Sequence, residues 1–146
     1  MQLVIFTLDQ EQFALRLDAV DGVVRAVSAG ALPKAPQIVD GVINVHGRIM
    51  PVVNVRRRFN LPEREIALTD KFILAHTVRR PVCLVVDAVI AVGEYPDQSI
   101  EAADSVLPNL EYVAGIMRLP EGVVLIHDLE EFLSLEEEAS LERALA

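Results

Sequence analysis

Tryptophan is absent from this 146-residue sequence, and aromatic residues of all kinds make up only 5% of it. Hydrophobic residues nevertheless account for 52%, so the core must be built mainly from valine, isoleucine and leucine. Because β-branched side chains pack well on a pleated surface, this composition predicts a mostly β protein. The length fits a single domain, or two very small modules that share one core.

Cysteine is nearly absent as well. The lone Cys83 cannot form a disulfide within the chain, and it lies in the apolar run Pro-Val-Cys-Leu-Val-Val. We interpret it as a small buried hydrophobe in a reducing compartment rather than as a reactive thiol. The sequence also lacks an apolar run of about 20 residues, the length that spans a bilayer, and a basic leader with a cleavage site. We therefore expect a soluble cytoplasmic protein that does not insert into a membrane.

Motifs for catalysis and for cofactor binding are missing. The sequence has no Walker-type loop and no G-x-S-x-G motif, and no histidine pairs plausibly with Cys83. His46, His76 and His127 lack the spacing of metal ligands. We expect no enzymatic activity, no cofactor and no metal.

Positive charge is in the minority. The net charge of −9 opposes binding to phosphate backbones. The run Arg56-Arg57-Arg58 has no interleaved aromatics, so it predicts a solvated helix face, or contact with an acidic surface, rather than a nucleic-acid patch.

The charge is also uneven along the chain. Residues 1–80 hold 11 Lys and Arg against 8 Asp and Glu, whereas residues 81–146 hold 2 against 14. This asymmetry favours either head-to-tail association with a second copy or a related protein, or solubility alone, and charge by itself leaves both open.

The clearest local signal is a hairpin between Gly41 and Val55. Two β-branched runs flank the pair His46-Gly47, and both of these residue types tolerate positive φ. Pro51 has no backbone N–H, so we expect the second strand to lie at a sheet edge, to start at Pro51 or to carry a bulge.

Alternating and apolar runs predict further strands over residues 3–8, 13–17, 19–27, 72–77, 81–92, 113–117 and 123–126, with a polar loop over 97–111. The spacing becomes helical after Asp128, which predicts a C-terminal helical segment over 128–146 with Asp128 as its N-cap. We expect Glu136 to Glu138 to face solvent, while Leu141 and Leu145 can bring this segment onto the β structure.

Two halves of the chain, about 1–66 and 70–135, resemble each other in order. The matched groups are Asp18-Ala19-Val20 with Asp87-Ala88-Val89, Leu32-Pro33 with Leu107-Pro108, Gly41 with Gly115, Gly47 with Gly122, and loosely Val52-Val53-Asn54-Val55 with Leu125-Ile126-His127-Asp128. Such a repeat indicates duplicated strand modules, each too small to bury a core alone. It therefore predicts two small β-barrels that share an apolar seam. The equivalent Asp18 and Asp87 indicate a recurring turn or bulge rather than a catalytic acid.

Several of these segments also resemble a known family, the CheW-like chemotaxis coupling proteins. The residues that carry the resemblance are Phe6-Thr7-Leu8, Phe13-Ala14-Leu15, Pro36, the block Gly41 to Arg56, Val85-Val86-Asp87-Ala88-Val89, Tyr112-Val113-Ala114-Gly115, and Asp128-Leu129 with Phe132-Leu133. The resemblance extends from about Leu3 to Leu135, and the block Gly41 to Arg56 is its most specific part.

The resemblance implies an all-β domain of two packed five-stranded SH3-like β-barrels with a C-terminal α-helix, spanning residues 1–146. It also implies a non-enzymatic adaptor that couples the cytoplasmic helical tip of chemoreceptors to the regulatory domain of a CheA-type histidine kinase, at membrane-associated receptor arrays. The implied partner-binding positions are Val20, Gly22, Gly41, His46 and Phe72. From the residues themselves, Val20 and Phe72 can equally be core, and both glycines can serve backbone geometry.

Two of these positions depart from the family pattern. His46 stands where the family usually has Arg, and Gly22 stands where it often has Glu. Arg and His recognise carboxylates differently, so the departures concern which partner is bound. Two alternatives stay open at this point: an adaptor of a chemotaxis-like pathway with another output, such as surface motility, and a β-barrel that binds a small ligand in its seam.

Overall fold

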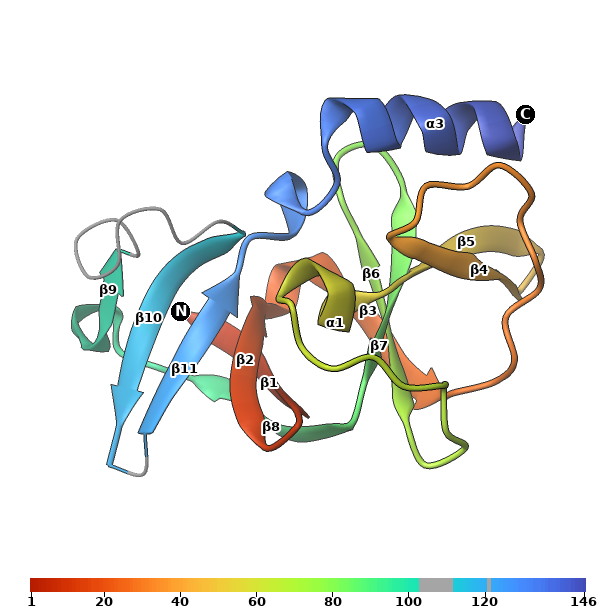
Figure 1. Cartoon of the computed structure of the whole chain (residues 1–146). Coiled ribbons are helices and arrows are strands. Elements are labelled where there is room, and N and C mark those ends of the chain that lie inside the picture. Colours follow the sequence, from red (N-terminus) through yellow and green to blue (C-terminus); the bar gives the residue numbers. More distant parts are fainter. Residues whose placement is uncertain (103–111, 121) are drawn as a thin grey trace.

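Strands dominate the computed structural model, which describes residues 1–102, 112–120 and 122–146 (Figure 1). The strands are β1 (Gln2–Leu8), β2 (Glu11–Arg16), β3 (Val20–Arg25), β4 (Val39–Val45), β5 (Arg48–Val53), β6 (Lys71–His76), β7 (Pro81–Val86), β8 (Ala88–Glu94), β9 (Ile100–Ala102), β10 (Val113–Leu119) and β11 (Gly122–His127). The helices are α1 (Val55–Arg58) and α3 (Leu135–Leu145), and single 3-10 turns occur at η1 (Leu17–Ala19), η2 (Asp97–Ser99) and η3 (Leu129–Glu131). The predicted all-β class with a C-terminal helix is confirmed.

The strands form two sheets, and each sheet takes strands from both halves of the chain. Sheet A has the order β8-β1-β2-β11-β10-β9, and sheet B has the order β3-β6-β7-β5-β4. Strands at matching places in the two halves occupy matching places in the two sheets. The chain changes sheet at η1 and again at Asp87, so the predicted single strand over 81–92 is wrong: it is two strands that belong to different sheets.

Each sheet closes through the chain that follows its outer strand. In sheet B, the segment after β3 returns to β4, where Gly30 bridges Val42. In sheet A, the chain after β8 continues into β9, which pairs with β10. Both closures lie beside a β-bulge at a matched glycine, Gly41 in β4 and Gly115 in β10. The predicted match of these glycines therefore reflects one backbone feature that occurs twice.

Clusters of buried apolar side chains fill this architecture. Successive side chains of a strand point to opposite faces. Phe72 and Leu74 of β6 therefore point to the face that the closed sheet B encloses, which we call its interior, while Ile73 and Ala75 point to the opposite face. A third cluster, which includes Leu3, fills the interior of sheet A. The largest cluster, which we call the seam, joins side chains of both sheets and of the C-terminal segment: Phe6, Leu8, Phe13, Leu15, Ile38, Val39, Val53, Val55, Ile73, Ala75, Val82, Leu84, Val86, Leu129, Phe132 and Leu141.

Cys83 is fully buried inside sheet B. Burial raises the pKa of its thiol to about 12, which keeps it protonated at neutral pH. The interpretation of Cys83 as a small buried hydrophobe is confirmed.

Pro51 does not mark a sheet edge, because β5 lies between β4 and β7. Opposite Pro51, Val42 exchanges both of its peptide hydrogen bonds with Gly30, on the far side of β4. The parallel pairing of β5 with β7 begins only at Val52. Pro51 therefore occupies an interior strand at a point where no donor is required.

The C-terminal helix begins later than predicted. Ser134, not Asp128, is the N-cap of α3, and it forms a capping box with Glu137. Leu141 is fully buried in the seam, so the helix packs onto the sheets (Figure 1).

The predicted loop over 97–111 begins with η2 and β9, and the rest of it, including the matched pair at 107–108, lies outside the described residues. None of the helices in the described parts of the chain is long and apolar enough to cross a membrane.

Candidate protein-interaction site

The hairpin of β4 and β5 turns at His46 and Gly47, as predicted. Their φ angles are 50° and 82°, which suits a two-residue hairpin loop of the primed type. The Gly47 N–H donates to Asn44 Oδ1 at 2.9 Å and steadies the turn. His46 is exposed at the tip, where another protein can reach it.

Gly41 lies where the chain after β3 closes sheet B. The peptide groups of Gly30 and Val42 exchange two hydrogen bonds of 2.8 Å, and a Cβ on Gly41 would lie 2.3 Å from the Gly30 oxygen. Any side chain at position 41 would therefore push apart the contact that closes the sheet.

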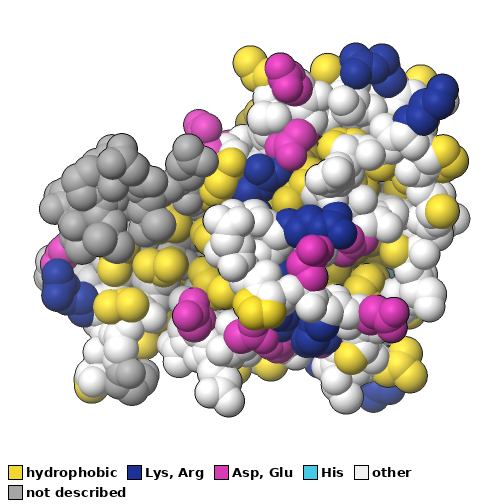
Figure 2. Space-filling view, viewed as in Figure 1, with side chains coloured by type: hydrophobic (Ala, Val, Ile, Leu, Met, Phe, Trp, Pro, Cys, Tyr) yellow, Lys and Arg dark blue, Asp and Glu magenta, His cyan; other side chains and the backbone are white. Residues whose placement is uncertain are grey.

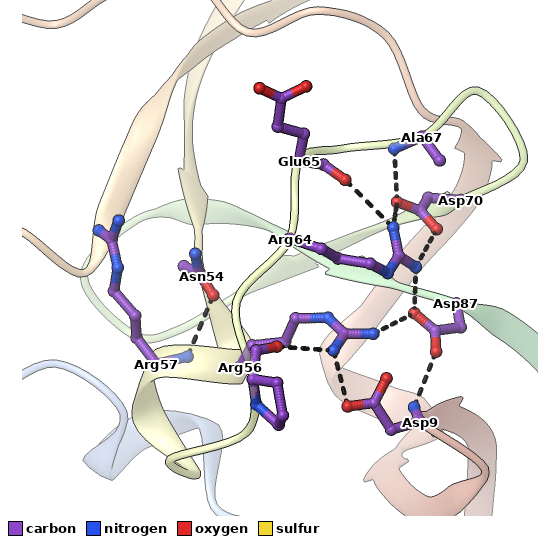
Figure 3. Close-up of polar contacts among 10 residues, drawn as sticks. Asp9, Asn54, Arg56, Arg57, Arg64, Glu65, Ala67, Asp70 and Asp87 are labelled. Carbon is purple, nitrogen blue, oxygen red and sulfur yellow. Dashed lines mark hydrogen bonds and ion pairs between the residues drawn. The ribbon is translucent and has the colours of Figure 1, made fainter.

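Arg56 lies in the first turn of α1 and is only 7% exposed. Its Nη1 donates to Asp9 Oδ2 at 2.8 Å and to the Pro62 carbonyl at 2.9 Å, and its Nη2 donates to Asp87 Oδ1 at 2.8 Å (Figure 3). Asn54 is the N-cap that fixes the start of this helix, because its Oδ1 accepts a hydrogen bond from the Arg57 N–H. Both arms of the buried guanidinium are thus used.

Arg64, from the connector after α1, reaches the same carboxylate (Figure 3). Its Nη2 donates to Asp87 Oδ1 and to Asp70 Oδ1, each at 2.6 Å, and the hydrogen bond to Asp70 is the main reason that the pKa of Arg64 is raised. Burial works to raise the pKa of Asp87, but hydrogen bonds from the Asp9 N–H, Arg56 and Arg64 outweigh it and hold that pKa below its ordinary value. Asp87 stays ionised at neutral pH.

This network joins three parts of the fold. Asp9 belongs to the β1–β2 turn of sheet A, Arg56 follows β5 of sheet B, and Asp87 stands where the chain passes from one sheet to the other. The interpretation of the arginine run as a solvated helix face is wrong for Arg56, and the acidic surface that it contacts belongs to its own chain. Asp18 and Asp87 both stand where the chain passes between the sheets, which agrees with the predicted recurring turn. Only Asp87 joins this network, because Asp18 pairs with the exposed Arg16 among the described residues.

A second set of ion pairs attaches α3. Both Glu137 oxygens accept from Arg58 Nη2 at 2.7 Å, and Glu138 Oε2 accepts from Arg80 Nε at 2.9 Å. The prediction that the Glu136 to Glu138 run faces solvent is wrong for Glu138, which is 6% exposed, and for the partly buried Glu137, although Glu136 is exposed.

Part of the charge asymmetry of the sequence is therefore neutralised by ion pairs inside the molecule. Four arginines of the basic half pair with carboxylates of the acidic half: Arg56, Arg58, Arg64 and Arg80. In Figure 2 basic and acidic side chains accordingly lie beside one another over the centre of this face. The asymmetry gives less support to head-to-tail association than the sequence alone suggested.

A groove of about 470 Å³ lies beside η1 and the bulge of β10. Its lining is mostly apolar, with charged residues among it: Met1, Leu15, Arg16, Asp18, Ala19, Ile100, Ala114, Gly115, Ile126, His127, Asp128, Leu129 and Glu130. Sequence reasoning missed this groove, although the match of Gly115 with Gly41 marked one of its walls.

The chain matches the CheW-like domain family over residues 2–137. It belongs to this family.

Relatives of this CheW-like chain include proteins named chemotaxis protein CheW. The protein from Treponema pallidum is 23% identical over 142 residues, which cover 93% of this chain and 84% of that protein. The protein from Thermotoga maritima is 31% identical over 100 residues, 68% of this chain and 66% of that protein. The crystal structure of the scaffolding protein TtCheW from Thermoanaerobacter tengcongensis superposes with a TM-score of 0.84 and 28% identity, covering 93% of this chain and 94% of that one. These matches support a chemotaxis adaptor, the class predicted from the sequence.

The five predicted partner-binding residues of this CheW-like chain do not form one cluster. The two outer strands of sheet B, β3 and β4, carry four of them. Two lie on β3, Val20 and Gly22, one lies on β4, Gly41, and one directly follows β4, His46. Phe72 is fully buried inside sheet B, which leaves it no surface for a partner.

The accessible members of the set lie among exposed apolar side chains. Along β3 and just after it, Val23, Val24 and Val27 are 42%, 41% and 53% exposed. Val20 itself is half-buried against the seam, and a Cβ on Gly22 would meet open space. The CheW-like chain therefore presents an apolar strand at the edge of sheet B, separate from the lining of the groove.

Proposed function

We propose that this chain is a non-enzymatic adaptor that couples the cytoplasmic helical tip of chemoreceptors to the regulatory domain of a CheA-type histidine kinase. The observation that carries the proposal is the match to a CheW scaffolding protein over 93% of the chain at a TM-score of 0.84. An adaptor needs two separate surfaces, and the molecule offers two. It would act in the cytoplasm, recruited to membrane-associated receptor arrays.

The groove is the surface that we assign to the receptor. Its floor is apolar, and Arg16, Asp18 and Glu130 supply charge, which is the composition of a protein interface with an apolar centre and a polar rim. An amphipathic helix can lay its apolar face into such a groove.

The edge strand β3 and the residues just after it are the surface that we assign to the kinase. Val23, Val24 and Val27 are exposed there, and Val20 and Gly22 belong to the same strand. His46, exposed at the tip of the β4–β5 hairpin, is a separate position that a partner can reach. The seam, by contrast, is filled by packed side chains, which disfavours the alternative of a small ligand bound between the sheets.

The test is binding of the purified chain to its own organism's kinase regulatory domains and receptor tips, by calorimetry and pull-down. Val23→Glu is expected to weaken kinase binding at least tenfold and to leave receptor binding unchanged. Ala114→Glu, which places a charge in the groove, is expected to do the reverse. Val123→Glu is the matched control, because Val123 is 53% exposed on β11 and belongs to neither surface. Failure of the unaltered chain to bind any kinase or receptor would contradict the proposal.

A further inference from the structure

His127 is the last residue of β11, and the structure corrects its place in the repeat. His127 pairs in register with Val113 of β10, just as Val53 pairs with Val39 of β4. His127 therefore stands at the position of Val53, which is fully buried in the seam, and not at that of Asn54. An imidazole occupies a site where the other half of the chain has an apolar side chain.

The described surroundings of His127 offer its ring no polar partner. The residue is 3% exposed, and neither Nδ1 nor Nε2 has a hydrogen-bond partner among the described residues. Its ring packs against Phe59 at 4.8 Å and Phe132 at 4.4 Å between centroids. Burial, and then the charge of Arg58, lower the pKa of His127 to about 3, so its ring is neutral at ordinary pH.

The two packing partners come from different elements. Phe59 follows α1, while Phe132 follows η3 and leads into α3. His127 thus stands where sheet A meets both α1 and the C-terminal segment.

The charged and titratable groups around His127 come from each of these elements. Arg58 on α1 stacks on Tyr112 and Phe132, at 4.8 and 5.6 Å from their centroids. Its Nε has no partner among the described residues, while its other nitrogens reach the Tyr112 hydroxyl and Glu137 of α3. Asp128 is the next residue along the chain, and its N–H donates to the Tyr112 carbonyl at 2.7 Å.

We propose that His127 is an acid-sensitive clip that holds the C-terminal segment, residues 129–145, on the two sheets. With a neutral ring, His127 fills the apolar space between Phe59 and Phe132. A protonated ring would place a second positive charge beside Arg58 and leave two donors without acceptors in an apolar site. Moving Phe132 and its segment away gives the ring access to water, so acid favours this local opening before the sheets themselves separate.

The sign and the size of the effect follow from proton linkage. The closed form binds the proton only near pH 3, whereas the opened ring titrates near its ordinary pKa of about 6.5. The closed form is therefore fully favoured above pH 6.5 and loses its advantage as the pH falls below that value. Between pH 7.5 and pH 5 the opening equilibrium of the segment should increase about 30-fold.

The test is amide hydrogen exchange of the full chain at pH 7.5 and pH 5, corrected for intrinsic exchange rates and read by mass spectrometry. Amides of α3 should lose about 30-fold of their protection in acid, while those of β6 and β7 lose much less. His127→Val, which installs the residue of the matched position, and His127→Leu, which keeps the volume of the site, should both abolish this difference. His76→Gln is the matched control, because His76 is exposed beside Asp21, and it should keep the response.

Two results would overturn the proposal. One is an α3 response that persists in both His127 variants, since the proton would then bind elsewhere. The other is an equal loss of protection in α3 and in the sheets of the unaltered chain, since the opening would then be global rather than confined to the clip.

Discussion

Arg56 and Asp87 are 31 positions apart in the chain, yet their side chains meet at 2.8 Å at the point where the backbone passes from sheet B to sheet A. Arg56 is 8% exposed by its side chain and Asp87 is 26% exposed. Since Asp9 of sheet A shares the same guanidinium, this one arginine connects the two sheets by charge as the seam connects them by apolar packing.

Arg56→Met is expected to lower the free energy of unfolding by about 2–4 kcal/mol, because it removes the cation of Asp9 and leaves Asp87 with Arg64 alone. The loss stays below that of a fully buried pair because Asp9 is 39% exposed. Arg56→Lys should recover only part of it, since an ammonium lacks the two-armed fork. Urea unfolding followed by circular dichroism measures the change.

The matched control is Arg57→Met in the same turn of helix. Arg57 is 39% exposed by its side chain, so its replacement should cost less than about 1 kcal/mol. Equal and small losses for the two methionine variants would contradict the role given to Arg56.

The pKa of Asp87 lies below its ordinary value in the folded chain, so this carboxylate contributes stability that is present above about pH 4 and is lost as the pH falls through its folded pKa. Asp87→Asn should therefore be less stable at pH 7 but should show a shallower loss of stability between pH 5 and pH 3. Asp18→Asn, at the matching repeat position, should keep the slope of the unaltered chain, because Asp18 is exposed and pairs only with Arg16 in the described part of the structure. Urea unfolding at several pH values measures both slopes, and equal slopes for the two variants would contradict the assignment.

Much of the fold could be predicted because local signals agree with it. His46-Gly47 identified the turn, and the alternating and apolar runs identified most of the strands. The matched Gly41 and Gly115 even indicated that one backbone feature occurs twice. These signals are short-range, or repeat at a fixed offset, so a sequence displays them directly.

The parts that could not be predicted depend on tertiary contacts. The run Pro81 to Val92 is apolar except at Asp87. The match of Asp87 with Asp18 indicated a turn or bulge there, but nothing local shows that the chain leaves one sheet for the other at this residue. Asp128 and Ser134 are both good N-cap residues, and the packing of Phe132 into the seam decides that the helix begins after Ser134. The burial of His127 was not predicted, because a single histidine at the end of a strand carries no local signal of burial and the loose alignment placed it opposite Asn54, one residue out of register.

Gly41 is expected to be a structural glycine before it is an interface residue. Gly41→Ala places a Cβ 2.3 Å from the Gly30 oxygen and should destabilise the protein by about 2–4 kcal/mol, because backbone must move to relieve the clash. Gly115→Ala should cost less, since one of its two neighbours at 3.1 Å is the Ile100 side chain. Thermal unfolding measures both.

Gly22→Ala is the control for this series, because a Cβ there meets nothing within 4 Å, and it should change stability by less than about 1 kcal/mol. A fully stable Gly41→Ala variant would contradict the closure of sheet B at Gly30. A Gly41→Glu variant that loses kinase binding therefore indicates an interface role for Gly41 only if this variant is shown to fold.

Gly22 and His46 are the better probes of partner choice, because both are accessible and neither is required by the core. Gly22→Glu and His46→Arg together restore the acid and the base that the resemblance to the family implies at these positions. An arginine fork binds a carboxylate through two parallel hydrogen bonds, which an imidazole cannot do. We expect the double variant to bind the regulatory domain of a CheA-type kinase from another organism at least tenfold more tightly than the unaltered chain does, with thermal stability nearly unchanged. Calorimetry measures the affinity of the unaltered chain and of the double variant for this kinase and for the kinase of the chain's own organism. If the ratio of the two affinities is the same for both chains, Gly22 and His46 do not select the partner.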